Sequence, residues 1–195
     1  MDLAIASLAL LFLLPLILFV AVLVHLDGGD VIFGHSRVGT GGRLFRVFKF
    51  RTMCPNADQK LKDHLELDAA ARREWQLTQK LRNDPRVTRV GAFLRKSSID
   101  ELPQLLNVLR GEMSIVGPRP IVQSEVARYG RYIQHYKRCR PGITGLWQVS
   151  GRNDVTYRRR VAFDTIYCRH LGEVNFELAV LLRTIPAVLR SKGSY

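Results

Sequence analysis

Residues 3–26 read LAIASLALLFLLPLILFVAVLVHL, an apolar run that contains no Asp, Glu, Lys or Arg. The run is longer than the roughly 20 residues that a straight helix needs to cross a hydrocarbon core. A cleaved signal peptide fits poorly, because no basic stretch precedes the run and no Ala-x-Ala site precedes Asp27. The sequence therefore predicts a membrane-embedded helix over residues 1–27 and one further domain over residues 28–195.

Pro15 lies in the middle of this run, where it removes a backbone hydrogen bond and predicts a kink. A kinked helix either spans the membrane or bends back so that both ends stay on one face, and the residues alone leave both topologies open. Basic residues flanking a membrane segment favour the cytoplasmic side. Such residues follow the run here: Arg37, Arg43, Arg46, Lys49 and Arg51.

The rest of the chain is strongly basic. Of 195 residues, 30 are Lys or Arg and 17 are Asp or Glu, for a net charge of +13, and Asp2 is the only charged side chain in residues 1–26. A hydrophobic content of 47% excludes a disordered chain. Three cysteines, an odd number without Cys-x-x-Cys spacing, argue against a disulfide scaffold or a zinc site and favour a reducing compartment.

Local patterns predict one helix-rich α/β domain with little strand. Alternating apolar and basic residues predict a strand over Arg43–Met53, with Lys49 and Arg51 on one face. Helices are expected over 56–82, 121–138, 154–170 and 174–190, and also around the stripe Leu102, Leu105, Leu106 and Leu109, which Gly111 ends. Short strands or turns are expected over Val87–Arg95, Ser114–Pro120, Pro141–Gly145 and Leu146–Val149.

Two adjacent carboxylates, Asp100 and Glu101, precede Pro103, which belongs in the first turn of a helix. Ser98 or Asp100 is then the expected N-cap, and Ser98 with Glu101 fits a capping box. A helix start would keep both carboxylates ionised, ready to bind Mg²⁺ or to attack phosphorus. Taken alone, this pattern is more often ordinary capping chemistry.

Nearby cations favour the functional interpretation. Arg95 precedes the two carboxylates, and Arg119 is held between two prolines, which suits bidentate phosphate binding. Residues 128–160 are also rich in arginine, although most such charges are solvated. Trp147 and the glycines of 141–152 shape either a nucleotide pocket or a packed hairpin with a core tryptophan.

These segments together resemble the bacterial sugar transferase family, the monotopic phosphoglycosyl transferases. The resemblance is carried by four ordered stretches: Val47–Met53, Asn83–Thr88, Ser98–Leu105 and Gly111–Pro120. It continues through Pro141–Gly145, and the residues that follow, Leu146–Arg152, are similar to exopolysaccharide-initiating members that use UDP-hexoses.

The resemblance implies a transferase that moves a sugar 1-phosphate from a UDP-sugar to polyprenyl (undecaprenyl) phosphate and releases UMP. Asp100 would be the nucleophile, and Glu101 with Mg²⁺ would assist at the phosphates, both carboxylates serving as metal ligands. Substrate phosphates would be bound by Lys49, Arg51, Arg95, Arg119 and Arg152.

The resemblance also implies a re-entrant helix at the bacterial inner membrane, interfacial amphipathic helices and a catalytic domain on the cytoplasmic face. Leu14 departs from the small polar residue that family members often place before the kinking proline. The sequence does not identify the sugar, and its apolar membrane face favours a homodimer without establishing one.

Two other classes of protein also fit the charge. A membrane-tethered nucleic-acid binder would use the basic stretch 128–160, but no DNA or RNA module is recognisable and an acidic pair would repel nucleic acid. A non-enzymatic adaptor that coats anionic lipid leaves Asp100, Glu101 and Arg119 without a task. We therefore expect an enzyme that binds no nucleic acid.

Overall fold

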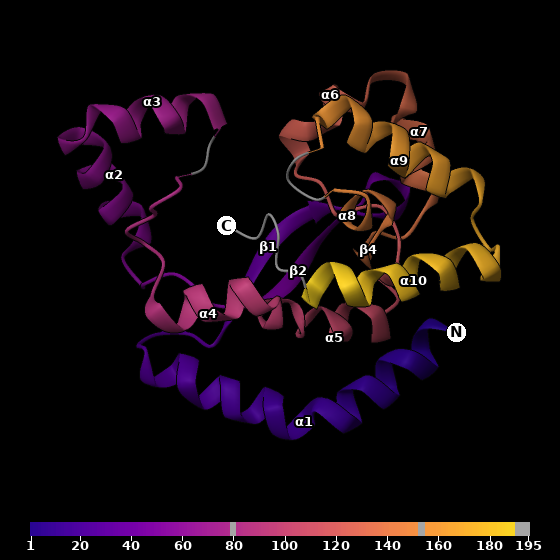
Figure 1. The fold of residues 1–195 in the computed structure, drawn as a ribbon, viewed down its shortest axis with the longest axis horizontal. Helices are drawn as coiled ribbons and strands as arrows, with labels where there is room; N and C mark the ends of the chain where they lie inside the picture. The colour runs from indigo at the N-terminus through magenta and orange to yellow at the C-terminus, as the bar shows by residue number, and fades with distance from the viewer. Residues whose placement is uncertain (79–80, 152–154, 190–195) are drawn as a thin grey trace.

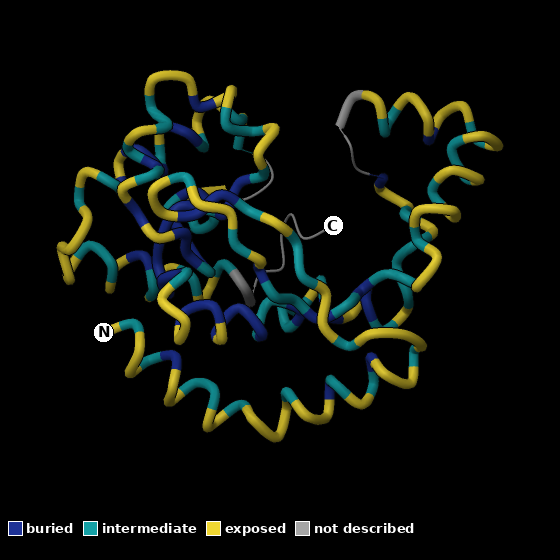
Figure 2. Tube along the Cα trace, turned by 180° about the vertical axis from the view of Figure 1, so that it is seen from behind, coloured by how far each residue is buried: buried dark blue, intermediate teal, exposed yellow. Residues whose placement is uncertain are grey.

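The apolar run forms one long helix, α1 (Asp2–Leu26), which continues through Pro15. The computed structural model describes residues 1–78, 81–151 and 155–189, and in it α1 lies along one side of the body and bends toward it (Figure 1). Ala6, Val20 and Val24 are its buried residues, and most of its other side chains are exposed (Figure 2). The predicted apolar helix is confirmed, and it is long and apolar enough to cross a membrane.

Both ends of α1 are bonded to the body. Near the first end, the Asp2 carboxylate accepts a hydrogen bond from the backbone N–H of Ile115 at 3.2 Å. Near the other end, the Val24 carbonyl accepts a hydrogen bond from the Arg51 guanidinium at 2.7 Å. The helix is therefore fastened at two points to one folded unit.

A β-hairpin follows α1. Strands β1 (Ile32–Val38) and β2 (Leu44–Phe50) pair antiparallel, from Ile32 opposite Phe50 to Val38 opposite Leu44. The predicted strand is confirmed over 44–50, whereas β1 was not predicted, because Gly34 and His35 interrupt its alternation. A turn at Thr40–Gly42 joins the strands, with positive φ at Gly41 and Gly42.

The helix predicted over 56–82 is wrong as a single element. The chain forms α2 (Ala57–Leu67) and α3 (Ala69–Thr78), with extended backbone at Asp68 between them. The Asp68 carboxylate accepts hydrogen bonds from the N–H groups of Ala70 and Ala71, and so caps the second helix. The two helices stand away from the body (Figure 1).

The strand or turn predicted over Val87–Arg95 is also wrong. The chain forms α4 (Arg89–Ser97), whose N-cap Thr88 accepts a hydrogen bond from the Gly91 N–H. A single 3₁₀ turn, η2 (Ile99–Glu101), leads to α5 (Gln104–Leu109), and Gly111 follows with φ of 74°. The predicted helix is therefore confirmed over 104–109 only.

The second half of the body is built on a two-stranded parallel sheet, β3 (Ser114–Val116) with β4 (Gly142–Thr144). The strand expected within 114–120 is confirmed, and the turn expected over 141–145 is instead mostly strand. A Cβ at Gly142 would lie 2.1 Å from the Gly117 backbone nitrogen, so this close approach of two chains requires glycine.

Between and after these strands the chain is helical. The helix expected over 121–138 is broken into short helical turns, because Gly130 adopts a positive φ of 50°. The strand expected over 146–149 is instead a helix. The elements are η3 (Gln123–Glu125), α6 (Val126–Tyr129), η4 (Gly130–Tyr132), α7 (Ile133–Arg138), α8 (Leu146–Val149), α9 (Tyr157–Arg169) and α10 (Val174–Leu189). The predictions for α9 and α10 are confirmed, and the fold is the expected helix-rich α/β domain.

Three apolar clusters form the core. One joins α1 and α10 to β3 and α5, a second joins α1 to β2 and α4, and a third lies around Tyr129 and Tyr136 without any residue of α1. Cys139 and Cys168 form a disulfide between the end of α7 and α9, while Cys54 is free. The expectation that the cysteines form no disulfide is therefore wrong for this pair.

Candidate active site

Asp100 lies in the η2 turn and is only 8% exposed. Ser98, just before this turn, ends α4 in the left-handed conformation with φ of 59° and makes no side-chain cap. Ser98 is the N-cap of η2, as expected, but the predicted capping box is wrong because its side chain makes no cap hydrogen bond, and its left-handed backbone reverses the chain. This reversal directs Asp100 back toward the hairpin, where Lys49 lies.

Lys49 is placed between the two carboxylates. Its Nζ lies 2.6 Å from Oε1 of Glu101 and 3.6 Å from Oδ2 of Asp100. The lysine is near the end of β2, so the hairpin and the η2 turn together assemble this charged group. The family resemblance identified Lys49 as a candidate, but only the fold brings it to the carboxylates.

Burial raises the pKa of Asp100, and the neighbouring charge of Glu101 adds to the effect, while Lys49 and Arg95 oppose it. The pKa shift of Asp100 therefore runs opposite to the one that a helix start would produce. The helix α5 begins only at Gln104, beyond both carboxylates, so its free N–H groups do not offset the loss of solvent. A carboxylate with little hydration is a better nucleophile once a cation holds it ionised.

Arg95 flanks the same group from α4. Its Nε donates a 2.9 Å hydrogen bond to the Thr52 hydroxyl, and burial lowers its pKa while Asp100 and Asp84 raise it. Asp84 is itself paired with Arg86 at 2.7 Å. Arg95 therefore contributes a partly desolvated positive charge beside Asp100, as the sequence predicted.

Arg51 has a different environment. Its three guanidinium nitrogens donate to backbone carbonyls of Val24, Asp30 and Met53 at 2.7–2.9 Å. The residue lines the same pocket, but its donors are engaged in holding the end of α1. The structure thus gives this predicted ligand residue an anchoring position.

Arg119 and Trp147 form the opposite wall. The Arg119 guanidinium lies over the Trp147 ring, with its Cζ 5.6 Å from the ring centroid. Trp147 is 2% exposed and still lines the pocket, so it is both a core residue and part of the wall. A Cβ at Gly145 would lie 2.2 Å from the Gly117 carbonyl oxygen, so this glycine serves close chain packing.

All these side chains line one pocket of about 1350 Å³. Its polar part contains Lys49, Thr52, Arg95, Asp100, Glu101 and Arg119. Its apolar part comes from the membrane helix and from α10, and includes Ile5, Ala9, Leu13, Leu16, Leu181 and Ala187. The predicted Arg152 lies outside the described residues.

Sequence patterns missed several lining residues. Thr52 and Gln148 lie within stretches that carry the family resemblance, but neither was selected as a site residue. The α10 residues belong to an apolar stripe that is equally typical of a core helix. Only the position of α10 across from α1 identifies them.

The carboxylate pair fits one Mg²⁺ ion. Among the described residues, no three His, Cys, Asp or Glu side chains come together as a metal cluster. Mg²⁺ is commonly held by one or two carboxylates, with water and substrate phosphates completing its shell. Asp100 and Glu101 are two adjacent carboxylates of this kind, with the Lys49 ammonium beside both, so Mg²⁺ at this pair stays a prediction.

A buried carboxylate among cations, in a pocket that one long apolar helix helps to enclose, defines a membrane-associated transferase domain. The chain belongs to the bacterial sugar transferase family, whose sequence model matches residues 1–191. The resemblance inferred from the motifs is therefore confirmed.

Curated relatives of the chain agree with this family assignment. The chain is 53% identical over 195 residues to the exopolysaccharide production protein ExoY of Sinorhizobium fredii, covering 100% of this chain and 86% of that protein. It is 49% identical over 194 residues to the undecaprenyl-phosphate galactose phosphotransferase of Salmonella typhimurium, covering 100% of this chain and 40% of that protein. The UDP-glucose:undecaprenyl-phosphate glucose-1-phosphate transferase of Escherichia coli is 37% identical over 203 residues, which cover 100% of this chain and 40% of that protein.

Proposed function

We propose that the protein transfers a sugar 1-phosphate from a UDP-sugar to polyprenyl phosphate, releasing UMP and forming a polyprenyl diphosphate sugar. The observation that carries this proposal is the position of Asp100: buried, next to Lys49, in a pocket lined both by arginines and by residues of the apolar helix α1. Such a pocket suits one water-soluble anionic substrate and one lipid substrate. The names of the relatives, which act in exopolysaccharide production and on undecaprenyl phosphate, agree with this division.

The reaction would proceed in two displacements. In the first, a carboxylate oxygen of Asp100 attacks the β-phosphorus of the UDP-sugar, the bond between that phosphorus and the bridging oxygen breaks, and UMP leaves with the electron pair. In the second, an oxygen of the lipid phosphate attacks the same phosphorus, and the Asp100 carboxylate leaves. Each step brings anions together, so the charges of Lys49, Arg95 and Arg119 lower both barriers.

Asp100 and Glu101 would hold Mg²⁺, which when bound supplies positive charge to the phosphate oxygens. The ammonium of Lys49 already lies against both carboxylates, so a cation is accommodated at this point. We infer that Lys49 keeps Asp100 ionised before substrate binds and moves with the phosphate oxygens afterwards.

The apolar half of the pocket suits the isoprenoid chain of the carrier. Leu13 and Leu16 of α1 and Leu181 and Ala187 of α10 line the same pocket as Asp100. A lipid phosphate that enters along α1 would therefore reach the carboxylate without leaving the membrane surface.

We propose further that α1 is re-entrant and that the body lies on the cytoplasmic face of the bacterial inner membrane. Asp2 and Val24 lie near opposite ends of the helix, yet both bond to the same body. A helix that crossed the bilayer would carry Asp2 about 30 Å away from the side on which Arg51 lies. The basic residues that follow α1 support the cytoplasmic side.

The activity test measures UMP release from a panel of UDP-hexoses and UDP-N-acetylhexosamines, with polyprenyl phosphate and Mg²⁺, for the wild type and for Asp100→Asn. We expect release with at least one sugar, and its loss in the variant. Asp63→Asn, at an exposed carboxylate of α2, is the matched control and should retain the wild-type rate. Turnover by Asp100→Asn at the wild-type level would overturn the proposed nucleophile.

The topology test introduces Asp2→Cys in a Cys54→Ser background, because Cys54 is the free cysteine of the described chain. A membrane-impermeant thiol reagent should label position 2 only after the cytoplasmic face is opened. Labelling of intact cells from the outer face would instead establish a spanning helix.

A further inference from the structure

Arg119 belongs to a cluster of three guanidinium groups, which we call the arginine cluster: Arg37, Arg119 and Arg160. Arg160 of α9 lies over the Trp147 ring with its Cζ 4.0 Å from the ring centroid, and Arg119 lies over the same ring at 5.6 Å. Two cations thus share one buried indole, and Arg119 also lines the pocket that holds Asp100.

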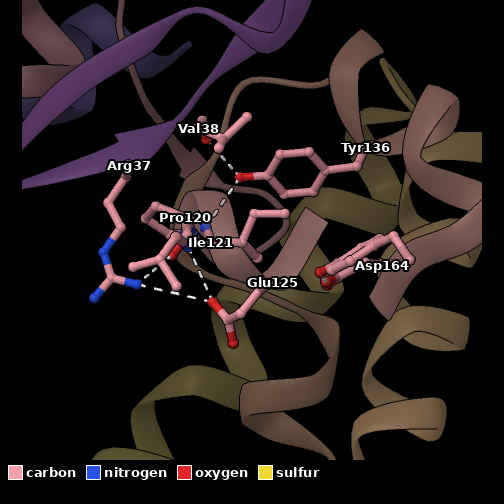
Figure 3. A network of polar contacts seen from close by, with 9 residues as sticks. Arg37, Val38, Pro120, Ile121, Glu125, Tyr136 and Asp164 are labelled. Carbon is pink, nitrogen blue, oxygen red and sulfur yellow. Dashed lines mark hydrogen bonds and ion pairs between the residues drawn. The ribbon is translucent and has the colours of Figure 1, made fainter. Parts of the chain in front are cut away.

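Arg37 completes the cluster from β1. Its Nη1 donates a 3.3 Å hydrogen bond to the carbonyl of Pro120, the residue after Arg119, and lies 4.0 Å from Oε2 of Glu125 (Figure 3). The neighbouring hydroxyl of Tyr136 donates to the Val38 carbonyl and accepts from the Ile121 N–H. These bonds fix the turn that carries Arg119 against the hairpin.

The cluster carries more positive charge than the carboxylates around it offset. Burial lowers the pKa of Arg37 and of Arg160, and in both cases the charge of Arg119 lowers it further. Glu125 contacts Arg37 at the 4.0 Å limit of an ion pair. Across residues 1–78, 81–151 and 155–189, no ion pair joins Arg119 or Arg160 to a carboxylate.

Asp164 does not fully supply the negative charge that would offset the arginine cluster. Burial raises its pKa to about 7, against the opposing effects of the Tyr129 hydrogen bond and of Arg160 and Arg119. Its Oδ2 accepts the Tyr129 hydroxyl at 2.6 Å. Guanidinium groups gathered in a desolvated place without matching carboxylates favour an external anion.

The pocket wall also offers unsatisfied polar atoms beside the cluster. Trp147 is 2% exposed, and its indole Nε1–H is buried without an acceptor among the described residues. Nε of Arg160, a donor of the cluster itself, is likewise buried without a partner among the described residues. A buried donor without a partner costs about 1–3 kcal/mol, and a ligand oxygen would remove that cost.

We propose that the arginine cluster and Trp147 form a second phosphate subsite, separate from the one at Asp100 and Lys49, which binds the phosphate that leaves as UMP. Arg119 and the Trp147 N–H contact this phosphate. Arg160 and Arg37 are positioning residues: they hold Trp147 and the Arg119 turn and add positive potential. The inference rests on the proposed function, because a nucleoside diphosphate sugar presents two phosphates and only one of them reacts with Asp100.

A phosphate at this subsite has two possible sources, the nucleotide and the carrier lipid. The position of the arginine cluster in the fold favours the nucleotide as the source of this phosphate. Arg37, Glu125 and Arg160 lie on elements that pack around the apolar cluster of Tyr129 and Tyr136, which contains no residue of α1. Figure 1 places α6, α7 and α9 on the side of the molecule opposite α1. The lipid enters beside α1, so this subsite lies toward water.

The test measures UMP affinity of the full chain in nanodiscs by calorimetry, which requires no turnover. Arg160→Met should weaken UMP binding by about tenfold or more, the loss of one charge-assisted contact network. Arg159→Met, one residue away on the exposed face of α9, removes the same charge and should change the affinity by less than about twofold. Arg160→Lys should restore part of the loss.

Kinetics separate the two phosphate sources. With Arg160→Met we expect KM for the UDP-sugar to rise while KM for polyprenyl phosphate stays unchanged. A rise in the lipid KM alone would assign the subsite to the carrier and overturn the inference. Trp147→Phe keeps an aromatic side chain, although a smaller one, and removes the N–H, so it provides an independent variant. Unchanged UMP affinity in both Trp147→Phe and Arg160→Met would also overturn the inference.

Failure of this inference is distinct from failure of the proposed function. If the wild type releases UMP from a UDP-sugar but the variants bind UMP as the wild type does, only the second subsite is wrong. If the wild type releases no UMP with any sugar, the proposed function itself fails.

Discussion

The ammonium of Lys49 lies 2.6 Å from the Glu101 carboxylate. This ion pair joins the end of the β-hairpin to the η2 turn, two segments 52 residues apart in the chain. It also places a cation 3.6 Å from Asp100, which is the carboxylate that burial drives toward its neutral form. The charge of Lys49 therefore opposes the effect of burial on the pKa of Asp100, the proposed nucleophile.

Lys49→Met should lower kcat/KM by about 10- to 100-fold and move the acid limb of the pH profile to higher pH. The reason is that Lys49 lowers the pKa of Asp100, so its removal raises that pKa and makes ionisation require a higher pH. The measurement is UMP release between pH 5 and 9. Lys60→Met, on exposed α2, should leave the profile in place; an unmoved acid limb in Lys49→Met would contradict this role.

Glu101→Gln should reduce turnover by about 100-fold while membrane attachment stays unchanged. The change removes one proposed metal ligand and the partner of Lys49. If Glu101 binds Mg²⁺, the variant should also need a higher Mg²⁺ concentration for half-maximal rate. A Mg²⁺ titration of both proteins checks this, and identical titration curves would exclude Glu101 as a ligand.

Arg51→Met should release the end of α1 and lower the free energy of unfolding by about 1–3 kcal/mol. Three backbone carbonyls lose their donor, including that of Val24 in the helix. Thermal unfolding in detergent measures the loss. Arg43→Met, an exposed arginine of the same hairpin, controls for charge, and equal stability of the two variants would argue against the anchoring position.

The protein should lose stability as pH rises through about 7 because of Asp164, whose pKa burial raises to about 7. A carboxyl with a raised pKa in the folded state stabilises fully below its unfolded pKa, and this contribution is lost as pH rises through the folded value. Asp164→Asn should flatten that part of the curve, since an amide can still accept the Tyr129 hydroxyl. The measurement is Tm between pH 5 and 9; a slope that Asp164→Asn leaves intact would assign it to another group.

The sequence predicted long, strongly patterned elements well. The apolar run is recognisable from its length and uniform hydropathy, and the strand around Lys49 from its alternation. Length alone was not sufficient, because the helix predicted over 56–82 breaks at Asp68. Short elements were less predictable. Leu146–Val149 forms a helix and Arg89–Ser97 forms another, because tertiary packing overrides weak propensity in segments of one or two turns.

For the site, the sequence identified residues but not their environments. It selected Asp100 and Glu101 and placed both at a helix start, whereas the structure buries Asp100 in a 3₁₀ turn, where burial and the charge of Glu101 raise its pKa. It selected Arg51 as a ligand residue, although its donors hold the backbone. Arg160 was one arginine among many in a basic stretch, and no local pattern separates it from the exposed Arg159.

The sequence by itself determined that this protein has an apolar helix, a basic body and the motifs of the bacterial sugar transferases, because composition, hydropathy and motif order are properties of the chain alone. Only the tertiary structure decided that both ends of the helix bond to one body, that Lys49 meets Asp100, and that Arg119 and Arg160 share Trp147. These facts depend on desolvation and on contacts between distant segments. Such free energies arise only when the chain is folded, so no local pattern encodes them.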